Sequence, residues 1–136
     1  MTVKKIKVFK NKVIKNKKGN IVKFVSTKNT FFKKFGEIYF NEIKYKNKKG
    51  WIKHLKNNCL IQCVSGKVKF LLIDNKNKEQ KYILKSGTGN ILRIPPNTWF
   101  SFSSLEKKSI IVNMTESYHQ DLEILKSKKI KNYLIK

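Results

Sequence analysis

Apolar and polar residues alternate along most of the chain, with the period expected of a β-strand that has one buried face. The clearest strands are predicted at 59–64 and 67–73, joined by Ser65-Gly66, which suits a tight hairpin turn. Further strands are expected at 21–25, 37–43, 81–84, 91–94, 99–102 and 109–114. Many short strands separated by turn-forming residues predict an all-β sandwich or closed barrel.

The stretch 121–131 changes period. Leu122, Leu125 and Ile130 recur at helical spacing, with acidic residues first and lysines last. Because this order of charge complements the helix dipole, we expect a short C-terminal helix packed outside the barrel. The chain contains no repeat and no linker, so residues 1–136 are expected to form one domain, long enough to bury a core.

The sequence also indicates the cellular compartment in which the protein is expected. No run of uncharged apolar residues is long enough to span a membrane, and the charged N-terminus lacks the apolar segment of a secretory signal. We therefore expect a cytoplasmic protein with no membrane partner. Cys59 and Cys63 are four residues apart in a predicted strand, about 13 Å along it, so they are expected to be reduced thiols rather than a disulfide.

The net charge of +24 raises the question of a nucleic-acid partner. Almost all of the positive charge is lysine, Arg93 is the only arginine, and the chain has no alanine. An AT-rich genome explains this composition, whereas a protein that grips bases or phosphates normally uses the planar fork of arginine. Nucleic-acid binding is therefore the least favoured hypothesis, although the positive field would attract any anionic ligand.

Two spaced motifs give the chain a resemblance to the cupin superfamily. The residues at the spacing of the first cupin motif are Ile52-Lys53-His54, Cys59 and Gly66. Those at the spacing of the second are Gly89, Pro95, Asn97 and Phe100. The resemblance implies a double-stranded β-helix, or jelly-roll, barrel.

Within the cupins, the chain resembles the dTDP-4-dehydrorhamnose 3,5-epimerases and the dTDP-sugar 3,4-ketoisomerases. The segments that carry this likeness are Lys49-Gly50-Trp51-Ile52-Lys53-His54, Lys18-Gly19-Asn20-Ile21, Ile94-Pro95-Pro96-Asn97-Thr98-Trp99-Phe100 and Thr115-Glu116-Ser117-Tyr118. The resemblance implies a metal-independent isomerase or epimerase of nucleotide-sugar and surface-polysaccharide biosynthesis. It also implies a dTDP-linked 4-keto-6-deoxy sugar as substrate, no cofactor, and a homodimer.

The same resemblance nominates site residues. His54 matches the second histidine of the ketoisomerase motif. If the chain is catalytic, His54 has to be the base, with Tyr39 or His119 as the acid. Lys49 would hold the diphosphate and Tyr118 would lie against the nucleotide base. Further substrate contacts would come from Asn57, Arg93 and Trp99. Each has a plainer alternative, since a buried aromatic or histidine can be core packing and a lysine can be one more solvated charge.

Several family positions have changed. The usual base is replaced by Ile52, and the epimerases' catalytic tyrosine aligns with Val112; neither can transfer a proton. His54 shares a strand face with Ile52, about 6–7 Å along. The four cupin metal positions are Ile52, His54, Cys59 and Phe100, too few donors for a metal. We therefore favour an enzyme with a displaced base. The alternative is a non-catalytic cupin that binds a sugar nucleotide or has a structural role.

Overall fold

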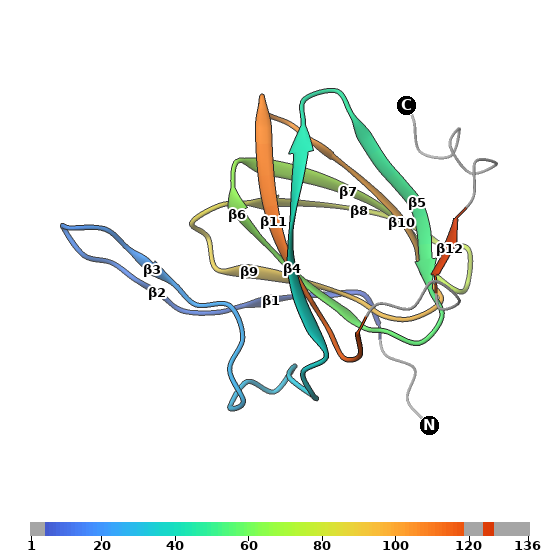
Figure 1. Cartoon of the computed structure of the whole chain (residues 1–136), viewed down its shortest axis with the longest axis horizontal. Helices are drawn as coiled ribbons and strands as arrows, with labels where there is room; N and C mark the ends of the chain where they lie inside the picture. Colours follow the sequence, from blue (N-terminus) through green and yellow to red (C-terminus); the bar gives the residue numbers. More distant parts are fainter. Residues whose placement is uncertain (1–4, 119–123, 127–136) are drawn as a thin grey trace.

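The computed structural model describes residues 5–118 and 124–126. Two five-stranded antiparallel sheets face each other, and a two-stranded ribbon extends away from them (Figure 1). The first sheet has the order β1-β9-β6-β11-β4, and the second β12-β5-β10-β7-β8. The first sheet and the ribbon comprise β1 (Lys7–Lys10), β9 (Asn90–Ile94), β6 (Cys59–Ser65), β11 (Lys108–Thr115), β4 (Glu37–Lys44), β2 (Val13–Ile14) and β3 (Ile21–Val22). The second comprises β12 (Ile124–Lys126), β5 (Lys48–His54), β10 (Trp99–Ser104), β7 (Lys67–Ile73) and β8 (Glu79–Lys85).

The main core lies between the two sheets. Ile61 and Ile111 from the first sheet join Phe70, Phe100 and other apolar side chains of the second in one buried cluster. Because alternate residues of a strand point to opposite faces, the alternation in the sequence is what supplies this inner surface. The prediction of an all-β protein is confirmed, and the predicted hairpin is observed as β6 and β7.

Strand β5 was not predicted by the alternation, because its first residues, Lys48-Lys49-Gly50, resemble a turn. It is nevertheless paired along its length with β10, with Ile52 opposite Phe100 and Lys49 opposite Phe102. The register shifts between Phe100 and Ser101, so a bulge marks this pairing. The segment is extended because it pairs with β10, and not because its own apolar and polar residues alternate.

The predicted C-terminal helix is wrong for the residues that the structure describes. Ile124, Leu125 and Lys126 form β12, which pairs antiparallel with β5, opposite His54, Lys53 and Ile52 respectively. The edge of β5 offers unpaired backbone groups, and satisfying them outweighs the helical spacing of Leu122 and Leu125. The rest of the predicted helix, 121–123 and 127–131, lies outside the described residues.

The turn before β10 fixes the end of β5. Asn97 occupies the position where the second cupin motif has glycine, and its φ of 66° lies in the left-handed region. Asparagine tolerates this region better than other residues with a side chain, so it can replace the glycine. The backbone N–H of Asn97 donates to the carbonyl oxygen of His54 at 2.8 Å, which holds the last residue of β5 in place.

Gly66 lies in the turn between β6 and β7, where the hairpin requires a residue without a side chain. Its φ is 85°, and a Cβ added there would lie 2.3 Å from Ser109 Oγ. Ser109 Oγ bonds both the N–H and the carbonyl of Lys67. Gly66→Ala is expected to lower the free energy of unfolding by more than the roughly 1–2 kcal/mol of left-handed strain alone, as measured by urea denaturation.

Gly87→Ala is the matched control for this change. Gly87 has a similar φ of 83°, but a Cβ there would meet nothing within 4 Å. Only the backbone strain is then expected, so the excess cost at Gly66 measures the collision with Ser109. Equal losses for the two variants would show that this collision is relieved without cost.

Two further apolar clusters cover the outer faces of the sheets. On the first sheet Leu60, Ile91 and Met114 are packed beneath Phe24 and Phe31, among others from the segment after the ribbon. On the second sheet Trp51, Leu71 and Ile73 pack together with Trp99. Within residues 5–118 and 124–126, no helix is long and apolar enough to cross a membrane.

Candidate functional site

Polar side chains gather where β4 and β5 separate. The two strands are consecutive along the chain, yet after the turn at 45–47 one enters each sheet, and they diverge (Figure 1). A hollow of about 550 Å³ opens between them, lined by Asn41, Lys49, Gly50, Trp51, Ile52, Phe102 and Lys126. The hollow therefore combines an apolar wall with two lysines and an amide, as an anionic ligand with an apolar part requires.

Lys49 links the two sides of this hollow. Its ammonium Nζ donates to Asn41 Oδ1 at 2.5 Å, across from β5 to β4. Both residues face the interior, because Asn41 lies opposite the core residue Ile111, and Lys49 lies opposite Phe102. The structure thus places Lys49, one of the predicted substrate contacts, at the mouth of the space between the sheets.

Tyr39 lies one inward position further along β4. The amide Nδ2 of Asn113, on β11, donates to the Tyr39 hydroxyl oxygen at 2.8 Å. Asn113 Oδ1 is buried and has no hydrogen-bond partner among the described residues. Because an unsatisfied buried carbonyl is costly, this oxygen is a ready acceptor for a ligand or water.

Asn113 was missed by the sequence analysis, which considered Val112 instead. The register places Val112 beside Phe40 and Gln62, on the outer face of the first sheet. Asn113 lies beside Tyr39 and the core residue Ile61, so it is the neighbour that points inward. The alternation of Ile111, Asn113 and Thr115 was the signal that could have identified it.

His54, the predicted base, is buried, with 5% of its surface exposed. Its ring is stacked with that of Phe100 at 12° between planes and 6.1 Å between centroids. Ile52, two residues earlier, packs against the core and lines the hollow. The imidazole therefore lies on the inner side of the barrel, on the same face of β5 as Ile52, as the period of two requires.

Asn57 is hydrogen-bonded to Ser117, the residue that precedes Tyr118. The side-chain oxygen of Asn57 accepts from both the N–H and the hydroxyl of Ser117, each at 2.9 Å. Asn57 thereby anchors the segment that leads to Tyr118, which is 65% exposed. His119 lies outside the described residues.

Arg93 and Trp99 are not brought to this hollow. Arg93 donates to the carbonyl of Lys5, and its guanidinium lies 5.1 Å from the Phe9 ring centroid, on the outer face of the first sheet. Trp99 belongs to the outer cluster of the second sheet, where Lys53 Nζ lies 5.0 Å from its ring centroid. Their positions separate them from His54, Tyr39 and Lys49.

The donor set does not fit the metal site known from the cupin pattern. Of the four positions, Ile52 and Phe100 are apolar, and only His54 and Cys59 offer a donor atom. In the part of the chain that the structure describes, no three His, Cys, Asp or Glu side chains converge. The polar groups of the hollow beside Lys49 are therefore the ammonium groups of Lys49 and Lys126 and the amide of Asn41.

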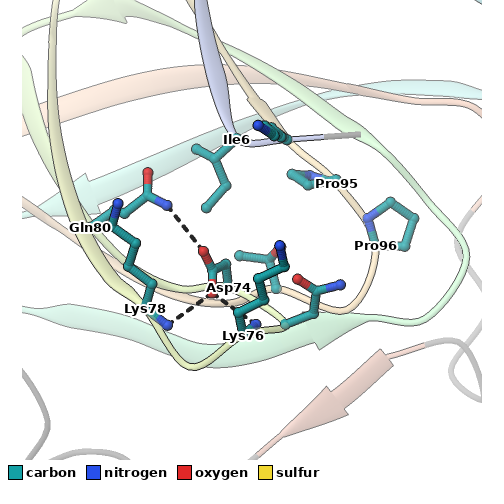
Figure 2. Close-up of a pocket in the computed structure, with 10 residues that line it drawn as sticks. Ile6, Asp74, Lys76, Lys78, Gln80, Pro95 and Pro96 are labelled. Atoms are coloured by element: carbon teal, nitrogen blue, oxygen red, sulfur yellow. Dashed lines mark hydrogen bonds between the residues drawn. The ribbon is translucent and has the colours of Figure 1, made fainter. Parts of the chain in front are cut away.

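A second hollow, of about 380 Å³, lies between the segment before β1, the turn after β7 and the loop after β9, beside Ile6, Pro95 and Pro96 (Figure 2). Asp74 is its acidic residue, and the carboxylate accepts from the N–H groups of Lys76 and Lys78 and from Gln80 Nε2. Because these bonds hold the turn between β7 and β8, the carboxylate has a structural role there.

The two cysteines, Cys59 and Cys63, form no disulfide and are both buried, in agreement with the prediction from their spacing. Burial raises the pKa of Cys63 from 9.0 to about 11, although its Sγ also bonds the carbonyl oxygen of Ser65 at 3.4 Å. The folded state therefore retains this proton in a range where the unfolded chain has lost it. The stability that this contributes is complete below pH 9 and is lost as the pH rises from 9 toward about 11.

A Cys63→Ala variant tests this assignment. Since many lysines also titrate in this range, the quantity to compare is the pH dependence of the free energy of unfolding in the two proteins. The wild-type value is expected to fall more steeply above pH 9 than that of the variant. Parallel curves from urea denaturation would mean that the Cys63 thiol has an ordinary pKa.

Comparison with solved structures gives several close folds. A dTDP sugar isomerase from Desulfovibrio desulfuricans G20 is 23% identical with a TM-score of 0.85, over 92% of this chain and 85% of that one. QdtA, a sugar 3,4-ketoisomerase from Thermoanaerobacterium thermosaccharolyticum crystallised with TDP, is 17% identical with a TM-score of 0.80, over 92% and 90%. A dTDP-4-dehydrorhamnose 3,5-epimerase from Bacillus anthracis, with TDP and PPi bound, is 14% identical with a TM-score of 0.81, over 89% and 77%.

At these identities, the solved structures establish the fold. No curated protein sequence matches the chain. The family described as "FdtA: WxcM-like, C-terminal" matches residues 4–134, nearly the whole chain. The protein therefore belongs to the FdtA/WxcM-like C-terminal family.

Proposed function

We propose that the protein binds a dTDP-linked 4-keto-6-deoxy sugar in the hollow between β4 and β5 and isomerises or epimerises it. The observation that carries the proposal is the inward placement of Tyr39 on β4 and of Lys49 and His54 on β5, with Lys49 in the lining of the hollow. Relatives of the same fold have been crystallised with TDP or a TDP-sugar, which supports this class of ligand.

The proposed reaction begins with removal of the proton on C3, beside the C4 ketone, by His54. The electron pair moves into the C3–C4 bond, and O4 takes a proton from Tyr39. Return of a proton to C4, with loss of the proton on O3, completes a 3,4-ketoisomerisation. Return of a proton to the opposite face of C3, with return of the O4 proton to Tyr39, instead restores the C4 ketone and completes one step of an epimerisation. Hydrogen bonds to O4 stabilise the charge that develops in between.

In this proposal Ile52 has replaced the family's base, and His54 performs its role from the next inward position. Lys49 neutralises the diphosphate, since an ammonium acts there as a compact point charge. Asn113 holds the Tyr39 hydroxyl, which would fix the direction from which the acid approaches. A displaced base predicts slow turnover, because a 1 Å error in placing a catalytic group can cost about a hundredfold in rate.

A non-catalytic sugar-nucleotide-binding or structural role is the second candidate. It is favoured by the packing of His54 against Phe100 and by Ile52 at the base position, because both make the inner wall more apolar. A packed imidazole that no solvent reaches cannot exchange protons at a useful rate.

One incubation distinguishes these candidates. The protein is mixed with dTDP-4-keto-6-deoxyglucose in heavy water, and deuterium is located by NMR and mass spectrometry against a protein-free control. Deuterium at C4 supports a ketoisomerase, whereas deuterium at C3 with inverted configuration, or at both C3 and C5, supports an epimerase. If no deuterium enters, calorimetric titration with dTDP and UDP separates a binding protein from a structural one.

We also expect a homodimer in the cytoplasm. Ile38, Phe40 and Val64 expose apolar surface on the outer face of the first sheet, where β4 forms an edge. Apolar patches of this kind commonly mark an interface, and an open strand edge invites pairing. Light scattering during size-exclusion chromatography measures the mass, and a monomer across the accessible concentrations would exclude the dimer.

A further inference from the structure

A row of polar side chains crosses the outer face of the second sheet. Ser103 on the central strand β10 lies opposite Lys48 of β5 on one side and Lys69 of β7 on the other. Adjacent strands are about 4.8 Å apart, so the two lysines flank a single serine. Ser101 lies two residues earlier on β10 and therefore faces the same way.

The two lysines act on each other. Burial and then the charge of Lys69 lower the pKa of Lys48. The Lys48 ammonium lies 5.3 Å from the centroid of the Trp51 ring, which holds it above the sheet. Like charges that share one face of a sheet repel, and an anion between them would convert this repulsion into attraction.

The hydroxyl of Ser101, the buried member of this row, makes no hydrogen bond among the described residues. Ser101 is 0% exposed. A buried hydroxyl without a partner destabilises a fold, so its presence needs a reason. A ligand or water that reaches this oxygen would supply one.

A hollow of about 380 Å³ includes all four side chains. Its other lining residues are Tyr45, Lys46, Leu71, Phe102, Ser104 and Leu105, and none of the lining residues is acidic. It therefore offers positive charge and hydroxyl groups beside an apolar wall. It opens on the outer surface of β5, β10 and β7, whereas the hollow beside Lys49 opens between the two sheets.

We propose that Lys48, Lys69, Ser101 and Ser103 form a binding site for the phosphate group of a small molecule on the outer face of the second sheet. A tetrahedral dianion accepts hydrogen bonds from both ammonium groups and from the serine hydroxyls at once. The hollow is larger than a phosphate ion, which leaves space for an attached organic group against Leu71 and Tyr45. The site does not depend on the sugar-nucleotide function proposed above.

An NMR titration of the full chain with inorganic phosphate tests this proposal. The amide signals of Ser101 and Ser103 are expected to move and saturate, whereas chloride at equal ionic strength leaves them in place. Lys48→Met and Lys69→Met are each expected to weaken binding about tenfold or more, since each removes a charge-assisted contact. Lys10→Met, an exposed lysine on the other sheet, is the matched control and should leave the affinity unchanged.

Ser101→Ala provides a second measurement that does not depend on the lysines. Removing the unsatisfied hydroxyl should raise the Tm of the phosphate-free protein while weakening phosphate binding. A variant with a lower Tm and unchanged affinity would mean that the hydroxyl has a structural partner and no ligand.

The source of the phosphate is tested in parallel with glycerol 3-phosphate and with vesicles that contain phosphatidic acid. Saturable binding of dissolved glycerol 3-phosphate is the expected result. Binding to vesicles alone would replace the small molecule by a membrane surface and overturn the proposal. Shifts that do not saturate, or an equal loss in Lys10→Met, would reduce the effect to the general charge of the protein and overturn it as well.

Discussion

His54→Gln is expected to lower the rate of deuterium exchange into dTDP-4-keto-6-deoxyglucose by about 10²–10⁴-fold, the usual contribution of a positioned general base. Glutamine has similar volume and keeps a hydrogen-bonding group, but it cannot take up a proton at neutral pH. His54 is the only histidine among the described residues, so no second imidazole there is available to take over its role. The measurement is the initial rate of mass increase at a fixed enzyme concentration.

Lys53→Gln is the matched control for this change. Lys53 precedes His54 on β5, but its side chain lies over Trp99 on the outer face of the sheet. Its replacement should leave the rate within a factor of about two, because it changes surface charge without reaching the interior. An equal rate in wild type and His54→Gln would assign proton removal to another group, with Tyr39→Phe as the next variant to measure.

Phe100→Ala is expected to lower the free energy of unfolding by about 3–5 kcal/mol, as is usual for removal of a buried aromatic ring. Phe100 is 2% exposed, and its ring is stacked with His54 at 6.1 Å and with Phe102 at the same distance between centroids. The change leaves a cavity beside the proposed base. Urea denaturation followed by circular dichroism measures the loss.

The control is Phe35→Ala, because Phe35 precedes β4 and is 61% exposed. Its replacement should change stability by no more than about 0.5 kcal/mol. A loss below about 1 kcal/mol in Phe100→Ala would mean that the barrel collapses around the missing ring and that its centre is not tightly packed.

Local pattern predicted most strands because each has one face in the core. Strands β4, β6, β7 and β11 are rich in apolar residues, and turn residues separate β6 from β7 and β7 from β8. It failed for β5 and β12, whose extended conformation depends on a partner strand. Propensity and spacing describe only the segment itself, whereas an unsatisfied strand edge is a property of the assembled sheet.

The candidate site shows the same division. The family resemblance indicated Lys49 and His54, and the period of two indicated Tyr39; all three lie on the inner side. It grouped Arg93 and Trp99 with them, but the structure places both on outer faces. The sequence of one strand does not tell which of its two faces points into the barrel. The packing of the whole sheet against the other sheet decides this.

The sequence by itself determined that this chain forms paired β-strands around an apolar core, because the period of two specifies one buried face per strand. Only the tertiary structure decided that Asn113 rather than Val112 reaches Tyr39, and that Lys48 and Lys69 flank Ser103. These pairs come from strands far apart in the chain. A one-residue change of register would exchange every inward residue for its outward neighbour.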